Sequence, residues 1–123
     1  MGYLAVSAVA VLLVCSPAFA QSDVAGNWRV EFVVPSGEKA VNMTINQKGT
    51  TLSGRVINED GEFPAEGRIV GDQVTFAWTV PDEGEQVTIT MKGTVRGDDI
   101  SGVAQLGNVG EGTLSAHRMS RNP

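Results

Sequence analysis

Cysteine is nearly absent from this chain of 123 residues. The one cysteine, Cys15, lies in an apolar N-terminal stretch, and residues 21–123 contain none. This part of the chain therefore has no disulfide, no thiol nucleophile and no cysteine-based metal site. A domain of its length buries about 60–70% of its unfolded surface, which is enough for one hydrophobic core without cross-links.

Basic residues are also few. The chain has 9 Lys and Arg against 14 Asp and Glu, a formal net charge of −5. Because a nucleic-acid site needs clustered basic side chains to neutralise phosphates, we expect no nucleic-acid partner. The sequence has neither a polybasic stretch nor an amphipathic helical pattern that would favour binding to a membrane surface.

Signals for catalysis and metal binding are missing as well. The only histidine, His117, falls on the outward side of the last predicted strand, and a general base needs a partner within hydrogen-bond reach. No residues follow the spacing of a catalytic triad or of an EF-hand calcium loop. Asp98 and Asp99 are adjacent, so they point to opposite sides of a strand. We predict a protein that is not an enzyme, with no metal and no cofactor.

The first 20 residues resemble a targeting segment rather than part of the fold. Apolar residues over 4–15 are too few to span a bilayer, and Ala18 and Ala20 fit the small-residue rule for signal-peptide cleavage. The usual basic residues before the apolar run are missing. We expect residues 1–20 to be a secretory signal peptide and residues 21–123 to be a single domain, secreted or periplasmic, with no membrane insertion after cleavage.

What the sequence does contain is alternation of apolar and polar residues, with turn residues at regular intervals. After a polar lead-in over 21–25, this period of two predicts strands and no helix. Pro64, which has no N–H, predicts a bulge or a local opening in the fourth strand. The second strand has Val41, Met43 and Ile45 on one face. The other seven strands are expected over Asn27–Val34, Thr51–Ile57, Glu62–Ile69, Gln73–Val80, Glu85–Val95, Ile100–Leu106 and Gly112–Met119.

One hairpin phrase occurs twice. Residues 67–74 read Gly-Arg-Ile-Val-Gly-Asp-Gln-Val, and residues 93–100 read Gly-Thr-Val-Arg-Gly-Asp-Asp-Ile. In both, a Gly-Asp pair separates two alternating segments, which predicts a β-hairpin with a tight turn. The same turn chemistry explains the tripeptide at residues 96–98, which matches an integrin-recognition sequence.

About eight short strands joined by short connections predict antiparallel neighbours in chain order. An open sheet would expose two edges, and pairing the last strand with the first removes both. We therefore favour an all-β, eight-stranded, up-and-down antiparallel barrel over a two-sheet sandwich. Tight curvature needs inward residues without a Cβ, and glycine occupies the inward positions 54, 67, 93, 102 and 112.

The two ends of such a barrel differ. The turns at Gly49, Gly71 and Gly97 are minimal and share one end with the N-terminus. The loops at the other end carry acidic residues against the single Lys39. Such residues can serve only to keep a sheet protein soluble; if a ligand binds at this end, we expect it to be cationic or neutral. These longer connections are 35–39, 58–61, 81–85 and 107–111, with Glu38, Glu59, Asp60, Asp82, Glu83, Glu85 and Glu111.

Two features resemble the calycin pattern of lipocalins, avidins and fatty-acid-binding proteins. Gly26-Asn27-Trp28 opens the first strand, and Arg118 lies near the end of the last. In calycins a Gly-x-Trp near the start is covered by a basic side chain from the final strand, which closes one end of the barrel. The resemblance implies that Arg118 packs over Trp28. The Gly-rich phrase at residues 110–118 is also similar to the ends of small secreted bacterial domains of unassigned function.

We predict a non-catalytic module that binds a small apolar or neutral ligand inside the barrel. Inward aromatic and sulfur-containing side chains form the predicted ligand site, with a basic residue at its closed end: Trp28, Phe32, Met43, Phe76, Trp78, Met91 and Arg118. The alternative is a ligand-free barrel, structural or protein-interacting, that binds a protein partner through its acidic loops.

Overall fold

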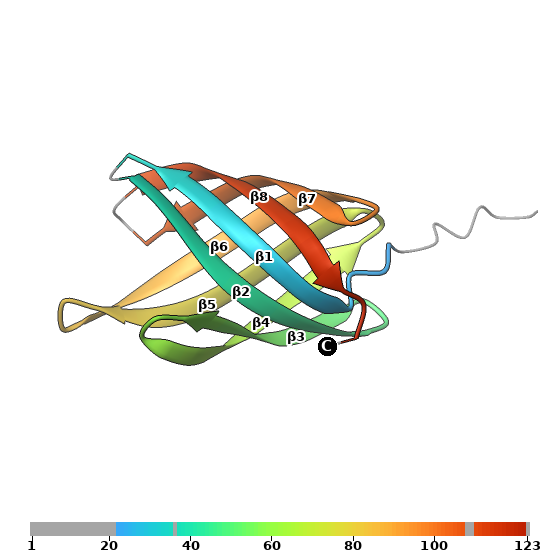
Figure 1. Ribbon diagram of the computed structural model, residues 1–123, viewed down its shortest axis with the longest axis horizontal. Coiled ribbons are helices and arrows are strands. Elements are labelled where there is room, and N and C mark those ends of the chain that lie inside the picture. Colours follow the sequence, from blue (N-terminus) through green and yellow to red (C-terminus); the bar gives the residue numbers. More distant parts are fainter. Residues whose placement is uncertain (1–21, 36, 108–109, 123) are drawn as a thin grey trace, which may run out of the picture.

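Eight antiparallel strands follow one another around a closed barrel in the computed structural model, which describes residues 22–35, 37–107 and 110–122 (Figure 1). This is the all-β architecture that the alternation predicted. Within the described ranges, no helix has the length and apolar character needed to cross a membrane. The predicted signal peptide lies outside the described residues. The strands are β1 (Gly26–Val34), β2 (Gly37–Lys48), β3 (Thr51–Asn58), β4 (Gly61–Val70), β5 (Gln73–Asp82), β6 (Glu85–Arg96), β7 (Asp99–Leu106) and β8 (Gly110–Ser120).

The barrel closes because β8 pairs with β1. Val30 lies opposite Ala116 and Phe32 opposite Leu114, so no edge is left between the last strand and the first. This pairing confirms the closed barrel that we favoured over a sandwich. Near the start of β1 the register shifts, and the shift sets Arg118 directly opposite Trp28.

Inward glycines mark places where neighbouring strands come close together. A Cβ on Gly54 would lie 2.0 Å from the carbonyl oxygen of Thr44, and one on Gly102 would lie 1.9 Å from that of Lys92. Both distances are well below van der Waals contact, and in each case the obstructing atom belongs to the backbone. The strands can therefore curve this tightly only because these positions have no side chain.

Substituting Gly102 by alanine is expected to lower the free energy of unfolding by about 1–3 kcal/mol, because the added Cβ forces β6 and β7 apart. The sign of the change in unfolding free energy is informative. A Gly→Ala substitution without strain usually stabilises a protein by about 0.4–1 kcal/mol, because alanine lowers the conformational entropy of the unfolded chain. Urea denaturation measures the change. Ser101→Ala, at the exposed neighbouring position, is the control and should change stability by less than about 0.5 kcal/mol. A stabilised Gly102→Ala protein would contradict the close approach.

Three two-residue turns and the N-terminal segment form the closed end of the barrel, at the right in Figure 1. Gly49, Gly71 and Gly97 each have φ of 61–64°, as the first residue of a tight hairpin turn requires. Residues 22–25 were predicted to be a polar lead-in, and this was wrong. The amide of Ser22 donates to the carbonyl of Gly71 at 3.0 Å, and the Val24 side chain is fully buried in the core.

The opposite end, which we call the mouth, is built from longer strands than the sequence predicted. β2 begins at Gly37 and β5 runs to Asp82, so positions assigned to loops 35–39 and 81–85 continue the barrel wall. The tip of the β5–β6 hairpin extends beyond the neighbouring hairpins (Figure 1). This lengthening matters for function because the period of two then carries charged side chains to the inner face.

The wall of the barrel opens locally beside Pro64. β4 pairs with β5 only over Ala65–Val70, and residues 61–64 pair with β3 alone. This confirms the local opening predicted from the proline. The facing segment of β5, residues 79–82, pairs only with β6 and also contains a proline, Pro81. Prolines on both free edges disfavour the addition of a further strand.

Candidate functional site

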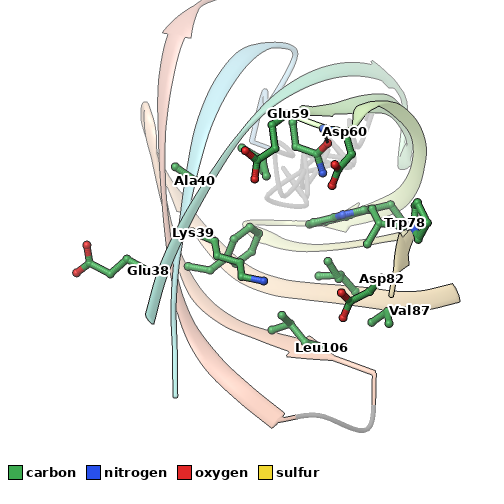
Figure 2. A pocket seen from close by; sticks show the side chains of 15 residues that line it. Glu38, Lys39, Ala40, Glu59, Asp60, Trp78, Asp82, Val87 and Leu106 are labelled. Carbon is green, nitrogen blue, oxygen red and sulfur yellow. Dashed lines mark hydrogen bonds between the residues drawn. The ribbon is translucent and has the colours of Figure 1, made fainter. Parts of the chain in front are cut away.

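A cavity of about 480 Å³ opens at the mouth, within the range of small-molecule sites in proteins. It lies between the β1–β2, β3–β4 and β5–β6 hairpins (Figure 2). Its lining is Phe32, Glu38, Lys39, Ala40, Val41, Asn58, Glu59, Asp60, Trp78, Val80, Pro81, Asp82, Val87, Ile89 and Leu106.

The inner part of this cavity is apolar. The rings of Phe32 and Trp78 lie 6.0 Å apart between centroids and are tilted by 46°, so they form one continuous aromatic surface. Val80, Ile89 and Leu106 are only partly buried, and they pack against the core from the cavity side. An apolar ligand that covers these side chains would remove their remaining surface from water, which favours binding.

The rim of the cavity is charged. Lys39 pairs with Phe32 across β1 and β2, and Asp82 follows Val80 by two residues on β5, so both lie on the inner face. The turn between β3 and β4 adds Glu59 and Asp60. Figure 2 shows these carboxylates around the opening, whereas Glu38 points away from it, in agreement with its outward place in the strand alternation.

Sequence reasoning missed the inward position of Lys39 and Asp82. The turn residues in 35–39 and 81–85 predict loops, in which no side chain has a fixed inward or outward direction. The sequence could have revealed the inward position of Lys39. Lys39 precedes Val41 by two residues, as Val41 precedes Met43, and alternate residues of a strand share one face.

In the part of the chain that the structure describes, no basic side chain forms an ion pair with the rim carboxylates. Among residues 22–35, 37–107 and 110–122, no salt bridge within 4.0 Å involves Lys39, Glu59, Asp60 or Asp82. The turn itself is ordered by the side chain of Asn58, whose Oδ1 accepts a hydrogen bond from the Asp60 amide at 2.8 Å. The rim therefore presents the three carboxylates of Glu59, Asp60 and Asp82 and one ammonium group on a defined hairpin framework, an excess of negative charge.

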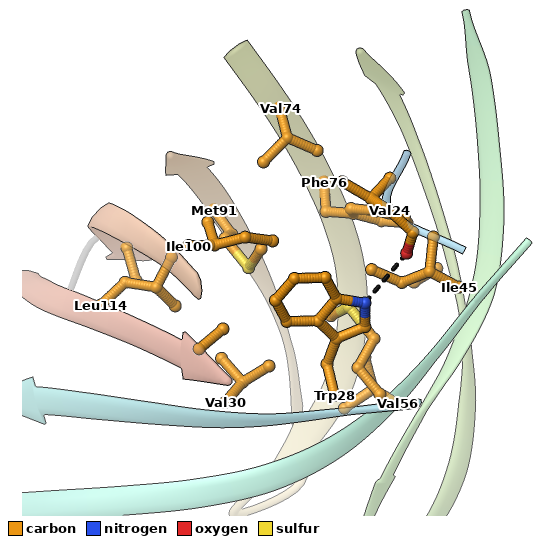
Figure 3. Close-up of a cluster of buried hydrophobic side chains, with 14 of the residues drawn as sticks. Val24, Trp28, Val30, Ile45, Val56, Val74, Phe76, Met91, Ile100 and Leu114 are labelled. Atoms are coloured by element: carbon orange, nitrogen blue, oxygen red, sulfur yellow. Dashed lines mark hydrogen bonds between the residues drawn. The ribbon is translucent and has the colours of Figure 1, made fainter. Parts of the chain in front are cut away.

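The predicted ligand site divides into two groups. Phe32 and Trp78 line the cavity. The structure places the other aromatic and sulfur-containing side chains in the packed core below it, each at most 1% exposed and none in the cavity lining: Trp28, Met43, Phe76 and Met91. Figure 3 shows Trp28 at the centre of this core, with Val24 above it from the N-terminal segment.

Arg118 lies at the closed end, as the sequence predicted, and covers Trp28. Its guanidinium carbon is 4.8 Å from the centroid of the indole ring, close enough for a cation–π contact. Its side chain is 2% exposed. Nη2 donates to the backbone carbonyls of Asp23 and Gly97, and Nη1 donates to that of Ala25 at 3.5 Å. Arg118 therefore joins the N-terminal segment to the β6–β7 turn.

The remaining nitrogen of Arg118 has an electrostatic partner only. Nε lies 3.3 Å from Oδ1 of Asp98 but makes no hydrogen bond of good geometry. The same carboxylate oxygen lies 3.2 Å from Nη2 of Arg121, which is exposed. These contacts build a structural clamp, because they tie the N-terminal segment at Asp23 and Ala25 to the β6–β7 turn at Gly97 and Asp98.

His117 lies on the outer face of β8, as predicted. Its Nδ1 is 2.7 Å from Oδ1 of Asp99, the residue opposite it on β7. Both side chains are about 70% exposed, so this pair lies in water and not in a cavity. No group of three or more His, Cys, Asp or Glu within the described part of the chain is arranged to hold a metal ion.

Comparison with known proteins adds no assignment. Neither a scan against protein-family models nor a search of curated proteins gives a match to this chain.

Proposed function

We propose that this protein is a secreted or periplasmic, non-catalytic binding module that takes a small ligand with an apolar body into the cavity at its mouth. The observation that carries this proposal is the aromatic pair of Phe32 and Trp78 at the base of a cavity of about 480 Å³, since such a surface gains binding energy only when a ligand covers it.

We also propose that the barrel is calycin-like. The support for this is the closed end, where Arg118 stacks on the tryptophan of the Gly-x-Trp phrase and holds the N-terminal segment across the barrel. In this arrangement the closed end provides stability and the mouth provides binding. The two tasks fall at opposite ends of one hydrophobic core.

The ligand proposal is tested with N-phenyl-1-naphthylamine, a neutral apolar dye whose fluorescence rises in apolar sites. We expect saturable binding by the folded protein. Trp78→Ala should weaken the affinity about tenfold, because a central aromatic side chain often provides 1–2 kcal/mol or more of binding energy. Val70→Ala, an exposed residue beside the turn at the closed end, is the control and should bind as the wild type does.

Absence of saturable binding by the folded protein would refute the ligand proposal. The alternative would then be favoured, in which the barrel binds a protein partner through its acidic loops. Equal affinities of wild type and Trp78→Ala would show that the dye binds outside the mouth.

A further inference from the structure

The cavity at the mouth has two chemically distinct layers. Phe32, Trp78 and Leu106 belong to its apolar inner part, and the charged side chains gather at the opening (Figure 2). A ligand that fills both layers must itself have an apolar end and a polar end. The sign of the charge at the polar end follows from the rim.

Carboxylates outnumber ammonium groups at this rim. Glu59, Asp60 and Asp82 face Lys39, and none of these four forms a salt bridge within the described residues. Beyond the cavity lining, the exposed side chains of Glu83 and Glu85 at the β5–β6 hairpin tip add negative charge. Cations are therefore attracted to the opening and anions are repelled.

We propose that the ligand of this cavity is an amphipathic monocation: an apolar body of the size of a short alkyl chain or a single ring system, bearing an ammonium group. The apolar body packs against Phe32 and Trp78, and the ammonium group lies among the rim carboxylates. This inference rests on the proposed function, because it assigns the ligand class of the same cavity.

The ammonium group of Lys39 competes with a cationic ligand for the rim carboxylates. Its side chain lies on the inner face of β2, beside Phe32 and among the carboxylates, where it acts as a tethered cation. A cationic ligand must share the carboxylates with it and is repelled by it. Removal of the Lys39 charge therefore strengthens the binding of a cation and weakens the binding of an anion. The change in affinity on removal of the Lys39 charge therefore distinguishes a cationic ligand from an anionic one.

The test uses three probes with the same eight-carbon chain and different head groups: octylammonium, 1-octanol and octanoate. Their affinities are measured at pH 7 by displacement of N-phenyl-1-naphthylamine and by titration calorimetry. We expect octylammonium to bind tightest and octanoate weakest. The octylammonium affinity should fall as salt is added, because partly exposed charges are screened. The 1-octanol affinity should not fall.

Two charge variants and two matched controls complete the test. Lys39→Met should strengthen octylammonium binding by about twofold to fivefold, and Asp82→Asn should weaken it by a similar factor, as is typical of partly exposed charge pairs. Both should leave 1-octanol binding within about twofold. Lys92→Met on the outer face of β6 and Asp72→Asn at the closed end make the same changes in net charge away from the mouth and should have no effect.

Two results would overturn the inference while leaving the proposed function intact. One is octanoate binding as tightly as octylammonium or more tightly. The other is weaker octylammonium binding by Lys39→Met. If none of the three probes and no dye binds to the folded protein, the proposed function itself fails, and the assignment of a ligand class fails with it.

Discussion

Replacing Trp28 by alanine is expected to lower the free energy of unfolding by about 3–5 kcal/mol, the range measured for removal of large aromatic side chains from packed cores. Trp28 is fully buried and lies at the centre of the hydrophobic cluster (Figure 3). Its Nε1 donates a hydrogen bond to the carbonyl oxygen of Val24 at 2.9 Å, and Arg118 covers its ring. The substitution therefore leaves a cavity, an unpaired buried carbonyl and a displaced guanidinium.

The measurement is urea denaturation followed by circular dichroism, with Trp28→Phe as an intermediate variant. Phenylalanine keeps most of the ring volume but cannot donate to Val24, so we expect a loss of about 1–3 kcal/mol from the unsatisfied acceptor and the lost contact. Since small domains are stable by about 5–15 kcal/mol, the alanine variant should be largely unfolded on heating to moderate temperature. A loss below about 1 kcal/mol for Trp28→Ala would contradict the central place of this residue in the core.

Replacing Arg118 by methionine is expected to cost about 2–3 kcal/mol, because backbone carbonyls that accept hydrogen bonds from a nearly buried guanidinium lose their donor. These carbonyls belong to Asp23, Ala25 and Gly97, and they connect the N-terminal segment with the β6–β7 turn. Methionine preserves apolar cover over Trp28. The loss therefore reports on the hydrogen bonds and the charge rather than on the volume of the side chain.

Arg121→Met is the matched control for this variant. Arg121 contacts the same Asp98 oxygen at 3.2 Å, but its side chain is 64% exposed, so its ion pair should be worth less than about 0.5 kcal/mol. Hydrogen exchange provides a second readout. In Arg118→Met the amide of Val24, which donates to Gln47 at 2.8 Å, should exchange faster, whereas in Arg121→Met it should stay protected. Equal effects of the two substitutions would contradict the clamp.

The sequence predicted most of the architecture because the two faces of each strand have different surroundings, so apolar and polar residues alternate along it. Alternation gave the eight strands, and the Gly-Asp pairs gave the tight turns at Gly71 and Gly97. The need to remove two free edges gave the closure of β8 on β1. The contact between Trp28 and Arg118 could be expected from the resemblance to calycins, and it is present.

The alternation of apolar and polar residues could not predict which part of the inner face is packed core and which part lines the cavity. By alternation, Trp28 and Phe76 are equivalent to Phe32 and Trp78, since all four point inward. Their depth along the barrel axis separates them, and this depth depends on how far each strand extends past its neighbour. The pairs Phe32–Leu114 and Ala65–Trp78 set that extent, and register is a property of two strands together.

The charge on the inner side of the mouth is the second feature that only the tertiary structure decided. The amino-acid order allowed residues 35–39 and 81–85 to be loops, in which no residue has a fixed inward or outward side. Lys39 pairs with Phe32 and Asp82 pairs with Glu85, so both hairpins are longer than predicted. The strand alternation then places Lys39 and Asp82 on the inner face of the barrel. The sequence by itself therefore determined that the chain forms a closed barrel with one aromatic inner face. Only the hydrogen-bonding register between neighbouring strands of the barrel decided where that face is filled, where it is open, and which charges surround the opening.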